Sequence, residues 1–152
     1  MSAKSRQLAD TLQKQEEILS GLLSITVKQR EALKEGRLSD LQTLMSDLRH
    51  MSVRAQAIET KRARAAGDIS QELGCEPVVS EIIKVLSPED GSVLEESAKK
   101  LISTVNALKI EMSILARLMD EAKTLNEMLI SEWRRLGQQF LGSSTGTFDT
   151  KI

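Results

Sequence analysis

The sequence has few of the residues on which catalytic and metal sites depend. It contains one histidine, His50, and one cysteine, Cys75, among 152 residues. A catalytic triad or a histidine-bearing metal site would have to be built around that single imidazole, which argues against both. One cysteine excludes a disulfide framework within the chain, and a reducing cytoplasm is the expected location.

Other patterns typical of enzymes are missing as well. The eight glycines are scattered, and none forms a phosphate-binding loop between a strand and a helix. Cys75 lies close to Glu72 and Glu76, whose charges oppose formation of a thiolate. Asp47 and His50 share a helical face, but a di-iron site needs a second such pair and further carboxylates. We therefore predict a protein that is not an enzyme, with no catalytic residue, no cofactor and no metal.

Aromatic residues and net charge are also scarce. There is one tryptophan, there are two phenylalanines, and tyrosine is absent, so aliphatic residues and methionine must form the core, as in elongated helical bundles. Lys and Arg number 21 against 22 Asp and Glu, and the net charge of −1 attracts neither nucleic acid nor an anionic membrane. No apolar run approaches the roughly 20 residues of a membrane span, and the polar N-terminus is unlike a secretion signal. No nucleic acid and no membrane insertion are expected.

What the chain does contain is a long amphipathic pattern between Ser92 and Leu141. Apolar residues recur there at alternating steps of three and four, which keeps them on one helical face, and only Asn126 interrupts the series. Proline is absent, so one helix of about fifty residues, or roughly 75 Å, is expected. Each apolar side chain gains about 1.5–3 kcal/mol on burial, so other helices or a partner must cover this face.

Two shorter amphipathic segments precede it. The first covers residues 3–35 and ends at Gly36, which can adopt the left-handed conformation that closes a helix. The second covers residues 39–73, and Ser39 with Gln42 forms a candidate capping box at its start. A connection this short predicts an antiparallel hairpin.

A short apolar segment, residues 78–86, follows the hairpin and predicts a connector helix on the first turns of the long helix. That long helix can begin at Pro88 or at Ser92, since both have good start signals. We predict an all-α fold: one domain, residues 1–141, forming an elongated antiparallel three-helix bundle with a short connector helix and a long C-terminal helix. Residues 142–152 are rich in Gly, Ser and Thr and predict a flexible tail.

The second helix carries the basic cluster of the chain, Arg49, His50, Arg54, Lys61, Arg62 and Arg64. Binding of nucleic acid would favour interleaved aromatic residues and a net positive charge, and both are missing. A solvated face with the aliphatic stems of Lys and Arg along the bundle is the preferred interpretation. Nucleic-acid binding stays open as a third possibility, behind binding of a protein partner and self-association.

Binding of a protein partner is the favoured function, because the long helix exceeds what two shorter helices can cover. Residues beyond about Asn126 are expected to be the least covered, and tryptophan is enriched at protein-binding hot spots. A second apolar line beside the main face widens it. Alternatively, the main apolar face and the second apolar line of this helix are both covered, either inside the three-helix core or in the seam of a dimer. The candidate partner-binding residues are Ile114, Leu118, Leu125, Met128, Leu129, Trp133, Leu136 and Phe140, with Phe148 as a candidate tail anchor.

The hairpin contains three further features: the run from Gln29 to Leu41, Glu59 with Arg62, and Leu73 with Gly74. In these residues it resembles the hairpin of the FlgN family of flagellar export chaperones. It extends over most of the chain, in the order of a leucine-rich first helix, a turn at glycine, a second long helix, a connector and a long last helix. Where family members often have a basic residue early in the second helix, this chain has Leu48. Family members also often have a C-terminal tyrosine that docks to the export gate, and Phe148 is the candidate replacement here.

The resemblance implies a cytoplasmic chaperone of a bacterial flagellar type III export system. Its clients would be hook-filament junction proteins, whose disordered terminal segments fold onto the last helix, and the cytoplasmic domain of the export gate would be a further partner. An amphipathic helix in an apolar groove is a known mode of recognition. The alternative, from a different class, is a structural coiled-coil adaptor that self-associates through its last helix, so that monomer and homodimer both stay open.

Overall fold

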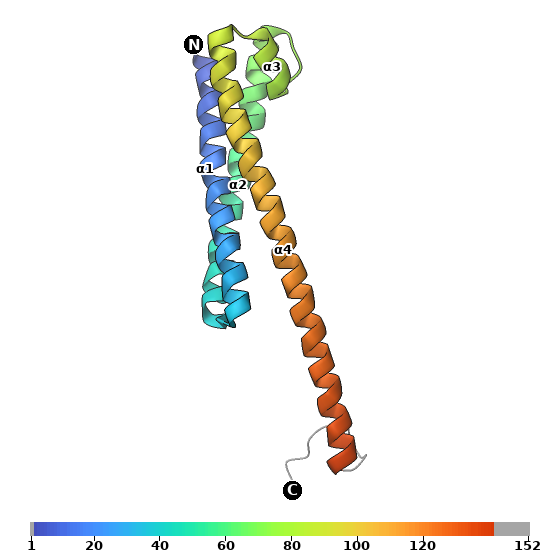
Figure 1. Ribbon diagram of the computed structural model, residues 1–152. Helices are drawn as coiled ribbons and strands as arrows, with labels where there is room; N and C mark the ends of the chain where they lie inside the picture. Colours follow the sequence, from blue (N-terminus) through green and yellow to red (C-terminus); the bar gives the residue numbers. More distant parts are fainter. Residues whose placement is uncertain (1, 142–152) are drawn as a thin grey trace. The chain divides into compact units, whose positions relative to one another are not determined.

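The protein is represented by a computed structural model, which describes residues 2–141 (Figure 1). Met1, residues 142–152 and the side chains of Phe140 and Leu141 lie outside the described part, and so do the predicted tail and Phe148. The described residues form four helices and no strand, which confirms the all-α prediction. The helices are α1 (Ala3–Glu35), α2 (Leu38–Leu73), α3 (Val79–Val85) and α4 (Pro88–Leu141). The chain forms two compact units, Met1–Ile114 and Leu115–Ile152, and α4 contributes to both. The assignment of residues 1–141 to one domain stays a prediction.

The turn between α1 and α2 is tighter than the sequence suggested. Gly36 adopts a left-handed conformation with φ of 69°, and the N–H of Arg37 donates to the carbonyl of Ala32 at 2.9 Å. This arrangement satisfies carbonyl groups at the end of α1 and reverses the chain within two residues. Helix α2 therefore starts at Leu38, directly after the turn.

The predicted capping box of Ser39 and Gln42 is wrong. Because α2 begins at Leu38, Ser39 already lies inside the first turn, and the N-cap residue Arg37 makes no side-chain capping bond. Instead, Asp40 places a carboxylate in the first turn, where the helix dipole favours negative charge. Its Oδ2 also accepts a hydrogen bond from Nη1 of Arg37 at 2.6 Å.

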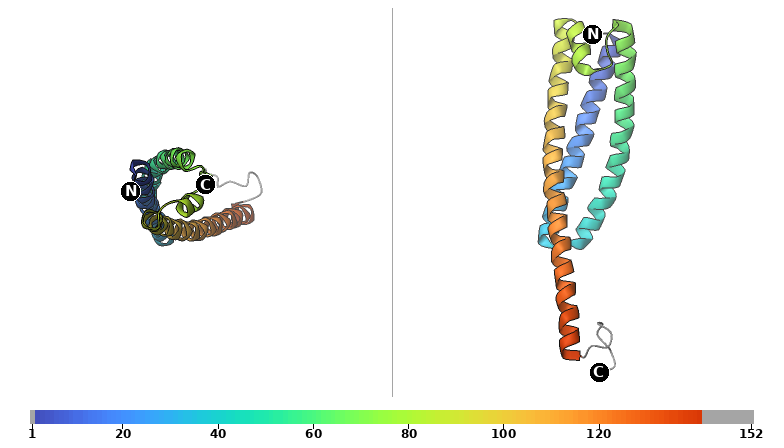
Figure 2. Two further views of the ribbon diagram at one scale, coloured as in Figure 1. Left: turned by 90° about the horizontal axis from the view of Figure 1, so that it is seen from above. Right: turned by 90° about the vertical axis from the view of Figure 1, so that its right-hand side faces the viewer.

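The long helix α4 begins at Pro88, the earlier of the two starts that the sequence offered. The N–H of Asp90 donates to Oγ of Ser87 at 3.3 Å, which caps the first turn. Gly91 is a buried helical residue, and a Cβ at this position would lie 3.1 Å from the carbonyl oxygen of Ile83. The connector helix therefore packs on the first turns of α4 as expected, and Figure 2 shows it between the ends of α2 and α4.

The apolar core of the Met1–Ile114 unit lies where all four helices meet. Its buried members are Leu8, Leu12, Ala65, Ala66, Ile69, Ile82 and Leu94. On α2, burial begins only at Ile58, so the half of the hairpin nearer the α1–α2 turn is less well covered. The buried face of α1 continues in that direction with polar side chains, including Gln15, Thr26 and Gln29.

Polar contacts join α1 to both of its neighbours within this unit. Glu59 of α2 accepts hydrogen bonds from Gln15 of α1 and from Arg62 of its own helix. Glu16 of α1 accepts from Oγ1 of Thr104 in α4 at 3.0 Å. Farther along the same two helices, Nε of Arg30 lies 2.9 Å from Oε2 of Glu111. These contacts set the register of α1 against α2 and α4.

The core predicts a sharp contrast between two substitutions in α3. Ile82→Ala removes a side chain that is 0% exposed, and it should lower the free energy of unfolding by about 2–5 kcal/mol. Val85→Ala, on the same short helix, changes a side chain that is 49% exposed and should cost less than about 1 kcal/mol. Urea denaturation followed by circular dichroism measures both. Equal losses would contradict the placement of Ile82 in the core.

The contacts of Glu59 predict a dependence of stability on pH. The hydrogen bonds from Arg62 and Gln15 hold the pKa of Glu59 below its ordinary value of 4.5. The ionised carboxylate therefore stabilises the fold above pH 4.5, and this contribution is lost as pH falls through the lower folded value. Glu59→Gln should lower stability at pH 7 by less than about 1 kcal/mol, because the group is half exposed.

Urea midpoints measured between pH 7 and pH 3 test this expectation. The difference in urea midpoint between the parent and Glu59→Gln should become smaller at acid pH, where the Glu59 carboxylate is protonated. Glu95→Gln is the matched control, since it removes an exposed pair with Lys99 on a single helix and should change the midpoint less. If Glu59→Gln lowers the urea midpoint by the same amount at pH 3 as at pH 7, the stabilising contribution of Glu59 is not ionic.

Candidate partner-binding site

The candidate site lies on α4 within the Leu115–Ile152 unit. From Met119 to Arg135 every residue is exposed. Four predicted site residues fall in this stretch, with exposed fractions of 58% for Leu125, 61% for Met128, 52% for Leu129 and 59% for Trp133. Large apolar side chains at such exposure are unfavourable in water, and contiguous exposed apolar patches are typical of surfaces that bind another molecule.

The other predicted residues differ in their surroundings. Leu118 and Leu136 are half-buried, and Ile114 is half-buried in the Met1–Ile114 unit. The side chain of Phe140 lies outside the described part. Uninterrupted exposure starts at Met119, earlier than the position near Asn126 that helix lengths had suggested.

Helix geometry gathers most of these side chains into one line. At about 100° per residue, six apolar residues fall within roughly 80° of the circumference of α4. We call this line the apolar stripe, and its members are Leu118, Ala122, Leu125, Leu129, Trp133 and Leu136. Met128 projects about 100° from Leu129 and forms one flank of the stripe.

The opposite flank contains a residue that the sequence analysis missed. Ile130, which is 43% exposed, projects on the same side as Met119, which is 57% exposed. The spacing in the sequence could have identified Ile130, because it lies four residues after Asn126 and three before Trp133, on the edge of the same helical face. Asn126 sits beside the stripe and offers an exposed amide there. A polar residue in an apolar helical contact favours one register of a bound helix.

The charges around the stripe balance. Residues 115–141 contain four basic side chains (Arg117, Lys123, Arg134 and Arg135) and four acidic ones (Asp120, Glu121, Glu127 and Glu132). Ion pairs along the helix occupy part of them: Arg117 lies 4.0 Å from Glu121, and Arg135 lies 2.9 Å from Glu132. A partner at the stripe would therefore be held by burial of apolar surface rather than by attraction between net charges.

The described residues offer no site for metal chemistry. Within residues 2–141 no group of three His, Cys, Asp or Glu side chains could hold a metal ion. The same residues contain no helix that is long and apolar enough to cross a membrane.

Comparison with known protein families matches residues 1–145 to the family described as FlgN protein. The chain belongs to the FlgN family. Membership in FlgN indicates a role as a flagellar export chaperone and confirms the resemblance found in the sequence. No individually curated protein and no solved structure gives a significant match.

The exposure of the stripe predicts that its residues contribute little to stability. Leu125→Gln combined with Leu129→Gln should change the free energy of unfolding by less than about 1 kcal/mol, because neither side chain is buried. Urea denaturation at two protein concentrations checks this expectation. A loss of several kcal/mol that depends on protein concentration would show that a second copy covers the stripe, as expected for the self-associating adaptor.

Proposed function

We propose that this FlgN-family chain is a cytoplasmic chaperone that binds the terminal segments of flagellar hook-filament junction proteins, which are hook-associated proteins. By covering these segments it prevents their premature assembly before type III export. Family membership supports the chaperone role. The observation that carries the proposal is the exposure of Leu125, Leu129 and Trp133 on one face of α4.

The chemistry of such a client matches the stripe. A segment that is disordered alone and forms an amphipathic helix on binding would place apolar side chains against α4 at steps of three and four. Ordering such a segment costs about 2–5 kcal/mol, which burial of several large side chains at about 25 cal/mol per Å² can offset. Leu129 and Trp133 would be the central anchors. Met119 and Met128 would adapt to clients of different sequence, because methionine repacks easily.

Trp133 provides a direct readout, because it is the one tryptophan of the chain and is 59% exposed. Addition of a peptide with the C-terminal sequence of a hook-filament junction protein should shift its emission to shorter wavelength as the ring leaves water. Leu129→Ala combined with Trp133→Ala should weaken binding of the labelled peptide at least 30-fold, as expected for about 2 kcal/mol or more at a hot spot. Fluorescence anisotropy measures this loss.

The matched control lies on the opposite face of the same helix. Glu127→Ala combined with Ser131→Ala truncates two exposed polar residues and should leave peptide affinity within about twofold of the parent. Equal affinities of the stripe variant and the control would remove the site assignment. A constant dimer mass by light scattering, unchanged by saturating peptide, would instead support the coiled-coil adaptor.

A further inference from the structure

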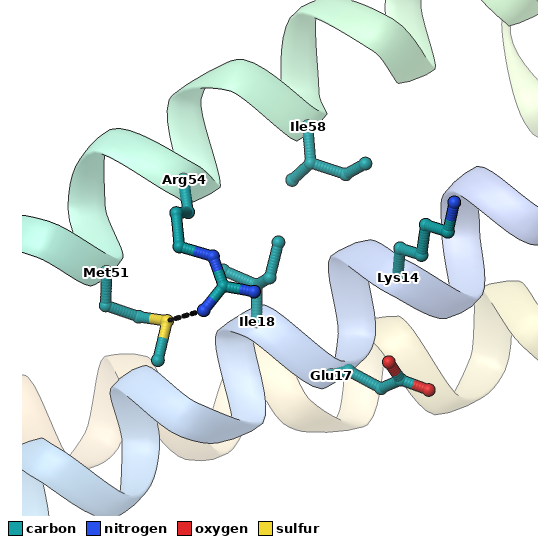
Figure 3. A pocket seen from close by; sticks show the side chains of 6 residues that line it. All are labelled: Lys14, Glu17, Ile18, Met51, Arg54 and Ile58. Carbon is teal, nitrogen blue, oxygen red and sulfur yellow. Dashed lines mark hydrogen bonds between the residues drawn. The ribbon is translucent and has the colours of Figure 1, made fainter.

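The hairpin of α1 and α2 contains a second candidate surface, in the Met1–Ile114 unit and separate in sequence from the stripe. Two surface pockets of about 350 and 510 Å³ lie between the two helices, and Lys14 lines both. The smaller pocket is shown in Figure 3, where side chains of α1 and α2 face each other across it. We call these two adjoining pockets the hairpin groove.

Basic side chains dominate the hairpin groove. Arg6 and Lys14 come from α1, whereas Arg54, Lys61 and Arg64 come from α2. The acidic side chains that line the pockets are Asp10 and Glu17, so the groove has an excess of three positive charges in a chain whose net charge is −1. The structure thus adds two basic residues of α1 to the cluster that the sequence showed on α2.

These cations are available for a partner. Within residues 2–141 none of the five forms an ion pair, in contrast to nearby Arg62, which pairs with Glu59 at 2.6 Å. In Figure 3 the side chain of Arg54 points from α2 toward α1, and its Nη1 donates to the sulfur of Met51 at 3.7 Å. A thioether is a weak acceptor, so the guanidinium keeps most of its capacity to bind a carboxylate.

The floor of the smaller pocket is apolar. Ile58 is 7% exposed, and Ile18 and Met51 are half-buried beside it. The terminal methyl of Met51 lies close to the backbone of Gly21, where an added Cβ would be 2.9 Å from it. Because α1 has no side chain at Gly21, the side chain of Met51 can pack between the two helices and form part of the pocket floor.

We propose that the hairpin groove binds an acidic amphipathic helix of a second partner protein, different from the client on the stripe. Apolar side chains of that helix would enter the pocket floored by Ile18, Met51 and Ile58. Its carboxylates would pair with Lys14, Arg54 and Lys61 on the rim. From Arg6 to Ile18 the groove follows about twelve residues of α1, or roughly 18 Å, which matches about three turns of a bound helix.

A protein helix fits this surface better than nucleic acid does. No aromatic side chain lines either pocket for base stacking, and a phosphate backbone has no apolar group to fill the floor formed by Ile18, Met51 and Ile58. An apolar floor edged by cations is complementary to a helix with an apolar face edged by carboxylates.

The test uses a labelled synthetic helical peptide of about 14 residues, with leucines on one face and glutamates on both flanks. The full chain should bind it more weakly as salt concentration rises, because the rim contacts are ionic. Lys14→Glu combined with Arg54→Glu should reduce the affinity at least tenfold. Lys28→Glu combined with Lys109→Glu changes the net charge equally at two exposed lysines outside the pocket of Figure 3, and it should retain most of the affinity.

Two altered peptides and one competitor complete the experiment. Replacement of the glutamates by lysines should abolish binding, and replacement of the leucines by serines should weaken it at least tenfold. Absence of binding by the acidic peptide, or an equal loss of affinity in both charge-reversal variants, would overturn the proposal.

A single-stranded oligonucleotide is the competitor. If it displaces the labelled peptide at a lower concentration than unlabelled peptide does, the proposal is overturned in favour of a nucleic-acid surface. The Trp133 response to the client peptide should be the same in all variants, so failure here is distinguishable from failure of the chaperone function.

Discussion

The shared apolar core of α1, α2, α3 and the start of α4 is the constraint on which the rest of the structure depends. Ile82 and Leu94 are fully buried there against Leu8 and Leu12 of α1, so the connector helix and the first turns of α4 are held by the hairpin. Burial then declines along α4: Leu94 is 0% exposed, Leu101 is half-buried and Met112 is 55% exposed. One amphipathic pattern therefore has two environments, since its beginning completes the core and its later part is exposed, where we propose that a partner binds.

The polar residues on the buried face of α1 give the hairpin uneven stability. Gln15 and Gln29 are buried, and within the described residues their Oε1 atoms have no hydrogen-bond partner. Burial of a polar amide is less favourable than burial of an apolar side chain, so this part of α1 stabilises the hairpin less than the apolar end of the core does. Contacts such as Glu16 with Thr104 and Arg30 with Glu111 favour one alignment of the helices, because a shift by one turn would separate these partners. Alignment in this part of the bundle thus depends on polar pairs more than on close apolar packing.

The helices could be predicted from the sequence because periodicity and glycine act locally. Helix α1 has the predicted bounds, 3–35, and α2 begins one residue earlier than predicted, because a Schellman-type turn at Gly36 takes fewer residues than a capping box at Ser39 would need. The exposure of Leu125 and Trp133 agrees with an argument from helix length alone. The hairpin groove could not be predicted, because Lys14 and Lys61 are far apart in sequence and meet only through the register of α1 against α2. That register is set by contacts such as Gln15 with Glu59, which no local pattern reveals.

The uninterrupted exposure of α4 from Met119 to Arg135 has a kinetic consequence. On the proposed function, a client would meet a face that is already open, so no lid would have to move first and association should follow client concentration without a slow preceding step. The residence time of such a client would be set by how many apolar side chains it buries on this face. Its release to the export apparatus would then require competition for those side chains rather than an opening movement of the chaperone.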